Sequence, residues 1–146
     1  MKVVNKWPAW LCLLLSLLTS SAQALSVYQV NARLYFGGQL KTDSAFVILE
    51  NDTSRYEEHG AGGYSLVLRV EQNAGGSYTV QAEISADQGK GQMLLGSPAL
   101  TLEKNQPAQV SFTSEKVGRV DLSLTLTEHR HIDESELQEC KYVECD

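Results

Sequence analysis

The sequence predicts an all-β protein, an antiparallel β-sandwich of about seven or eight short strands with a short acidic C-terminal tail. From residue 25 to about residue 131, apolar and polar residues alternate, which places the apolar ones on one face of each strand. Clusters of Gly and Asn, typical of tight reversals, separate the alternating runs, and no amphipathic helix lies among them. Strands with one apolar face bury it by stacking as two sheets.

Four runs show the clearest alternation and define the longest predicted strands. They cover residues 28–36, 65–71, 77–86 and 120–127. The second and third of these runs are joined by an Asn- and Gly-rich loop at residues 73–76, which predicts a hairpin. Shorter strands are expected at residues 45–50, 92–95, 99–103 and 108–113.

The first 24 residues have the pattern of a signal peptide. Lys2 and Lys6 give a positively charged N-terminal region, and residues 7–18 are apolar apart from one serine. A small-x-small cleavage pattern ends at Ala24. The apolar stretch is well below the roughly 20 residues that span a bilayer, although an uncleaved anchor is the alternative. We therefore predict cleavage after Ala24, a periplasmic or secreted location, and no transmembrane segment in the processed chain. The expected layout is a signal peptide (1–24), a β-sandwich domain (25–132) and an acidic tail (133–146).

Charge argues against nucleic acid as a partner. The whole chain has a formal net charge of −6, and loss of Lys2 and Lys6 with the signal peptide makes it −8. Binding to nucleic acid is driven by Lys and Arg that neutralise phosphates, so an acidic chain is a poor candidate.

Two cysteines, Cys140 and Cys145, lie in the acidic tail. In an oxidising compartment a local disulfide is the expected state, with free or intermolecular thiols and a metal site as alternatives. Residues five apart on a helix are separated by about 7.5 Å along its axis, beyond the reach of a disulfide, so a bonded pair requires a turn.

Three histidines are the candidate ligands of a metal site. His129 and His131 follow the last alternating run, and residues two apart on a strand point to the same face. His59, which follows two glutamates in a loop, is the candidate third ligand. Three ligands with one open position suit zinc or copper, and no other cofactor is expected. We favour surface histidines without a bound metal over this site, because a His-x-His pair alone occurs often and no third ligand has a fixed spacing.

The sequence contains none of the common catalytic motifs. There is no nucleophile elbow, no Ser-x-x-Lys, no His-Glu-x-x-His and no phosphate-binding loop. This favours a protein that is not an enzyme. A small-ligand or glycan-binding module is another alternative, because Tyr35 falls on the polar side of its strand, where an aromatic ring can stack on a sugar.

Residues 97–110 resemble a strand-turn-strand motif of bacterial secretins, in which Ser-Pro-x-Leu/Val is followed by an Asn/Asp-Gln/Asn turn and an Ala-x-Ile/Val strand. The resemblance implies a hairpin here and a bacterial envelope setting. It covers this segment only, since the rest of the chain has no similarity to a secretin pore. The matching residues are Ser97, Pro98, Leu100, Asn105, Gln106, Ala108 and Val110.

Together these observations predict an exported, non-catalytic module that binds another envelope or extracellular protein. A strand added at an open sheet edge is the expected mode of binding. Metal binding through the His-x-His pair is the first alternative function, and glycan binding is the second.

Overall fold

A computed structural model describes residues 24–133, which form nine strands and no helix. Accordingly, this part of the chain contains no helix that is long and apolar enough to cross a membrane. The strands are β1 (Leu25–Phe36), β2 (Gln39–Leu49), β3 (Ser54–Glu58), β4 (Tyr64–Gln72), β5 (Tyr78–Asp87), β6 (Gln92–Gly96), β7 (Ala99–Leu102), β8 (Pro107–Ser114) and β9 (Gly118–Ile132).

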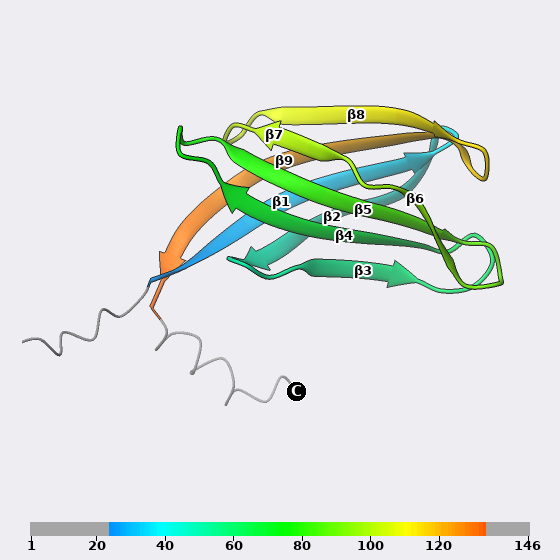
Figure 1. Cartoon of the computed structure of the whole chain (residues 1–146), viewed down its shortest axis with the longest axis horizontal. Coiled ribbons are helices and arrows are strands. Elements are labelled where there is room, and N and C mark those ends of the chain that lie inside the picture. Colours follow the sequence, from blue (N-terminus) through cyan, green and yellow to red (C-terminus); the bar gives the residue numbers. More distant parts are fainter. Residues whose placement is uncertain (1–23, 134–146) are drawn as a thin grey trace, which may run out of the picture.

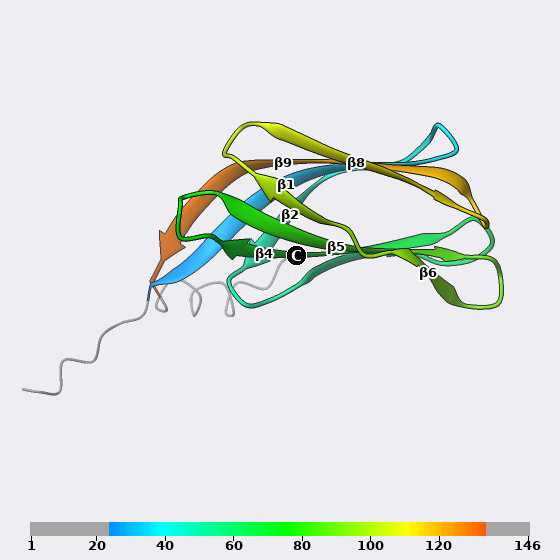
Figure 2. The ribbon, with the colours of Figure 1, turned by 45° about the horizontal axis from the view of Figure 1, so that its top comes forward.

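The strands form two antiparallel sheets stacked in two layers, which confirms the predicted β-sandwich (Figures 1 and 2). One sheet has the order β2-β1-β9-β8, so β1 and β9 are its central strands. The other has the order β3-β4-β5-β6, and β7 pairs with the first half of β5 on the same side as β6, which pairs with the second half. Each sheet therefore has two edges, and the edge strands are β2 and β8 in one sheet and β3 with β6 and β7 in the other.

The core lies between the two layers and consists of the apolar residues that alternate along the strands. Along β1, for example, Val30, Ala32 and Leu34 are fully buried, and the intervening Asn31 and Arg33 are exposed. Full burial of one aliphatic side chain contributes about 1.5–3 kcal/mol, so the alternation itself supplies the main stabilising term. The largest fully buried side chains are Tyr28, Tyr64, Leu34, Ile48, Leu66, Leu68, Ile84, Leu102, Leu122, Leu124, Leu126 and Val30.

The predicted hairpin around residues 73–76 is confirmed. β4 and β5 pair from Tyr64 opposite Ala86 to Gln72 opposite Tyr78. The loop is closed by a bond of 2.8 Å from the Asn73 amide to the Ser77 carbonyl.

Two expectations about strands need correction. The structure has nine strands, since β3 was not expected: its Arg55, Glu57 and Glu58 are exposed edge residues and show no apolar alternation. The hairpin implied by the secretin resemblance is wrong. Asn105 does make a turn, with a φ of 63°, but β7 pairs with β5 in one sheet and β8 pairs with β9 in the other. The segment is a corner between the layers.

Three predicted features lie outside the described residues. These are the signal segment up to residue 23, the acidic tail from residue 134, and the disulfide between Cys140 and Cys145.

Candidate functional site

A β-bulge determines which way the predicted histidines point. Opposite β1, the pairing of β9 steps from Leu126 to Glu128, so Thr127 has no partner in the ladder. The extra residue shifts the alternation by one position. His129 and His131 consequently lie on the inward face of the sheet, the same face as Leu126. They do share one face, as predicted, and that face is the one that covers the core.

The two histidines belong to a hydrogen-bonded cluster at the end of the sandwich. The histidine–tyrosine cluster comprises Ser26, Tyr28, Tyr78, His129 and His131. The Tyr78 hydroxyl lies 2.9 Å from His129 Nδ1, and His129 Nε2 lies 3.1 Å from Ser26 Oγ. Ser26 Oγ in turn lies 3.1 Å from His131 Nδ1. The chain of contacts joins the two sheets, because Tyr78 begins β5 and the other four residues lie on β1 and β9.

Aromatic packing holds the His129 ring in place. The ring stacks on Tyr28 with centroids 4.7 Å apart, and it meets the Tyr78 ring edge-on at 5.5 Å. Tyr28 is only 1% exposed, and its burial raises the pKa of its phenol. His131 is exposed and covers the outer side of His129, with centroids 4.8 Å apart.

Neutral imidazoles satisfy every contact in the cluster. A neutral imidazole has one donor nitrogen and one acceptor nitrogen, while a hydroxyl both donates and accepts. If Tyr78 donates to His129, His129 donates to Ser26 and Ser26 donates to His131, each contact has one donor and one acceptor. The opposite direction of donation satisfies the same three contacts. Burial, followed by the nearby His131, lowers the pKa of His129 below 6.5, which favours its neutral form.

The lowered pKa of His129 predicts a pH dependence of stability. The unfolded chain binds a proton on His129 more readily than the folded chain does, so folding favours the neutral ring. The resulting stabilisation is present above pH 6.5 and is lost as the pH falls through the lower pKa of the folded state. Denaturant unfolding of the natural chain and of His129→Gln, measured across this range, should show the difference in unfolding free energy shrinking towards acid. A difference that grows towards acid would contradict the assignment.

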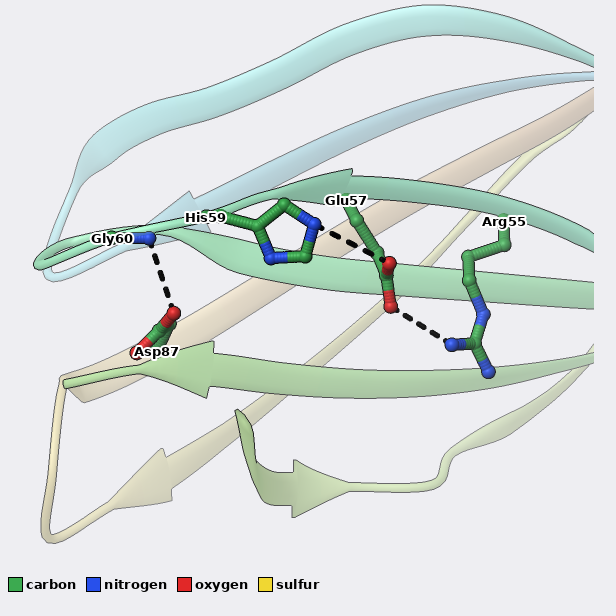
Figure 3. Close-up of polar contacts among 5 residues, drawn as sticks. All are labelled: Arg55, Glu57, His59, Gly60 and Asp87. Carbon is green, nitrogen blue, oxygen red and sulfur yellow. Dashed lines mark hydrogen bonds and ion pairs between the residues drawn. The ribbon is translucent and has the colours of Figure 1, made fainter. Parts of the chain in front are cut away.

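His59 does not join the other two histidines. It lies in the loop between β3 and β4, at the opposite end of the sandwich from the C-terminal end of β9 (Figures 1 and 3). Its Nε2 is 3.8 Å from the Glu57 carboxylate, which in turn accepts a 2.8 Å hydrogen bond from Arg55 (Figure 3). His59 was the candidate third ligand only if the fold brought it near His129 and His131, and the fold places it at the other end of the sandwich.

Within residues 24–133, no group of three or more His, Cys, Asp or Glu side chains is arranged to hold a metal ion. His129 and His131 supply two imidazoles at one place. Zinc or copper binding by that pair stays a prediction.

The loop that carries His59 is fastened by Asp87 at the end of β5. The Asp87 carboxylate accepts hydrogen bonds from the Gly60 amide at 3.1 Å and the Gly89 amide at 2.8 Å. These two bonds lower the pKa of Asp87, and the bond from Gly89 has the larger effect. The Asp87 amide also donates to the Gly63 carbonyl at 2.8 Å. Figure 3 shows the carboxylate directed at Gly60, so the polar residues here have a structural role in joining two loops.

Tyr35, the candidate sugar-stacking residue, lies on the outer face of β1, as its position in the sequence predicts. It is half-buried and pairs in register with Asp121 of β9. A surface hollow of about 300 Å³ lies beside it, with Ser111 and Arg119 among its lining residues. Tyr35 thus contributes to a polar surface, separate from the histidine–tyrosine cluster.

Comparison of the chain with protein-family models, with curated proteins and with solved structures finds no match.

Proposed function

We propose that this chain is an exported, non-catalytic module that binds an extended segment of another protein along the free edge of β2. Export is supported by the positive, apolar and small-x-small pattern of residues 1–24. The observation that carries the binding proposal is the composition of β2, a long edge strand whose second half has no charged residue.

The second half of β2 has the properties of a strand that pairs readily. Its sequence from Ser44 to Leu49 contains no charged residue, no Gly and no Pro, and three of its six residues are Phe, Val and Ile. Val47 is 65% exposed on the outer face of the sheet. Uncharged segments of this length with high β-propensity pair with other chains when they lie at an open edge. A partner strand would cover this segment and remove the hazard of uncontrolled association.

The other edges carry features that discourage strand addition. β3 is five residues long and bears an ion pair between Arg55 and Glu57 at 2.8 Å. β8 begins with Pro107 and presents polar outward side chains. β6 and β7 are five and four residues long. Short strands, charges and proline are the usual protections of sheet edges, so β2 is the favoured site.

The hydrogen-bond pattern identifies the backbone groups of β2 that are free to pair. The Glu50 amide donates to the Ser26 carbonyl at 2.8 Å, just beyond the last pair of the ladder. Antiparallel pairs alternate between bonded and non-bonded, so the next bonded residues of β2 are Ile48 and Phe46. The backbone N–H and C=O groups of Ala45 and Val47 therefore point towards the open edge. A partner would bond to these groups and place uncharged side chains beside Val47.

Replacing Ala45 by proline distinguishes strand addition, which needs the backbone of β2, from binding through side chains. Ala45→Pro removes an N–H that faces the open edge, while the ladder to β1 keeps its bonds. Thr113→Pro on β8 is the matched control: the Arg119 carbonyl accepts from Gly37 on the β1 side, so Thr113, which pairs with Arg119, also directs its N–H to an open edge. A photoreactive amino acid at Val47 reports the partner in cells that export the protein.

We expect a discrete cross-linked product from Val47 that is lost with Ala45→Pro and retained with Thr113→Pro. Both proline variants should keep the far-ultraviolet dichroism of the natural chain. A product that survives Ala45→Pro, or the absence of a product from Val47, would refute strand addition at β2.

A further inference from the structure

A polar groove runs along the outer face of the sheet that contains β1, β9 and β8. In this groove, short side chains on β9, the middle strand, lie between longer side chains on β1 and one longer side chain on β8. We call it the β9 groove. Its principal residues are Asn31, Arg33 and Tyr35 from β1, Ser123 and Thr125 from β9, and Gln109 from β8.

Strand register explains the groove. Ser123 of β9 lies directly between Arg33 of β1 and Gln109 of β8, because it pairs with both. Thr125, two residues further on the same face, pairs with Asn31. The hydroxyl side chains of β9 are half-buried, while the longer side chains beside them are exposed. The short residues of β9 between the longer side chains of β1 and Gln109 of β8 leave a trough.

Two hollows form one continuous surface. The hollow beside Tyr35 has a volume of about 300 Å³, and the one beside Asn31 has a volume of about 360 Å³. Gln109 and Ser123 line both hollows, so the two are contiguous. Along β9, the distance from Asp121 to Thr125 is about 13 Å at 3.3–3.4 Å per residue. The trough therefore has the length of a short linear ligand.

The charges on this face cancel. Arg33 Nε is 3.1 Å from the Asp43 carboxylate, and Arg119 Nε is 2.8 Å from the Asp121 carboxylate. Asp121 also accepts a hydrogen bond from Ser111. Each guanidinium thus has its own carboxylate, and no net charge is left to attract an anionic or cationic ligand. This distinguishes the groove from the chain as a whole, which is acidic.

We propose that the β9 groove binds a neutral oligosaccharide. Sugar hydroxyls donate and accept at once, and the amides of Asn31 and Gln109 also offer a donor and an acceptor each. The hydroxyls of Ser123 and Thr125 do the same from the floor of the groove. Tyr35 adds an amphipathic ring on which the C–H face of a sugar can pack. A neutral, hydroxyl-rich ligand matches a neutral, polar groove.

The inference is independent of strand addition at β2. The principal groove residues lie on β1, β9 and β8; Asp43 of β2 also lines the groove, but the edge residues Ala45 and Val47 do not. Failure of one proposal therefore leaves the other standing, and Ala45→Pro should leave saccharide binding unchanged.

The test uses three soluble neutral saccharides as probes: maltohexaose, cellohexaose and the fully N-acetylated chitohexaose. Each is titrated into residues 25–146 of the isotope-labelled protein, and amide chemical shifts are followed. We expect at least one probe to perturb Tyr35, Gln109 and Ser123 together, and an anionic oligogalacturonate to perturb them less. Loss of the two amides in the double variant Asn31→Ala/Gln109→Ala should weaken binding at least about tenfold.

Gln81→Ala supplies the matched control, because Gln81 is an exposed amide on the outer face of β5 in the other sheet. It should leave the affinity unchanged. The proposal is overturned if none of the three saccharides perturbs the groove, or if the double variant binds as tightly as the natural chain.

Discussion

Replacing Tyr28 by alanine is expected to lower the free energy of unfolding by about 3–5 kcal/mol, the cost of removing a fully buried aromatic side chain. Tyr28 is 1% exposed, and its ring contacts both His129 and Tyr78. The variant therefore creates a cavity and also removes the surface on which the His129 ring stacks. Equilibrium unfolding in denaturant, followed by far-ultraviolet dichroism, measures the loss.

Tyr28→Phe is the control for this change. It keeps the ring and its contacts with His129 and Tyr78, and it removes only the hydroxyl, so most of the stability should remain. If Tyr28→Ala cost no more than Tyr28→Phe, the ring would not have the central packing role that the structure assigns to it.

Gly63→Ala is expected to destabilise the loop between β3 and β4 by about 1–3 kcal/mol, the usual cost of forcing an extra carbon into a packed position. A Cβ at Gly63 would collide with the Glu58 carbonyl, lying 2.9 Å from its carbon atom. The obstacle is backbone, which cannot move aside as a flexible side chain would. Relief of the collision would also disturb the bond between the Asp87 amide and the Gly63 carbonyl.

Gly75→Ala provides a matched comparison in the loop between β4 and β5. A Cβ there meets no atom within 4 Å. Alanine also restricts the unfolded chain, so this change should alter stability by no more than about 1 kcal/mol, and in the favourable direction. Hydrogen exchange at the Asp87 amide should accelerate in Gly63→Ala alone. Equal behaviour of the two variants would show that the close approach at Gly63 is not a constraint.

The sandwich was predictable because its strands alternate cleanly where one face is buried. The pattern from Tyr28 to Phe36 survives in the structure, with each expected inward residue of β1 in the core. β3 escaped prediction because an edge strand rich in charges buries little, and its sequence from Arg55 to Glu58 resembles a polar loop. The corner at Asn105 was mistaken for a hairpin because the turn is local, whereas the choice of sheet depends on distant strands.

The candidate site was only partly predictable. The spacing of His129 and His131 indicated a shared face, and the structure agrees. Which face they share depends on the bulge at Thr127, which has no signal in the sequence. Ser26 and Tyr78 join the cluster from other strands through tertiary packing. The alternation predicted Tyr78 as a core residue, yet nothing local indicated that its hydroxyl would reach an imidazole.

The antiparallel pairing of β1 with β9 begins at Leu25 opposite Ile132, so the outer ends of these two strands lie side by side. A force that pulled these two ends apart would load the cross-strand bonds one after another from that point, and would not load them all together, because bonds in antiparallel pairs run across the strands. The fold would therefore open like a zipper under tension. Its resistance to stretching should be small even where its resistance to heat or denaturant is large.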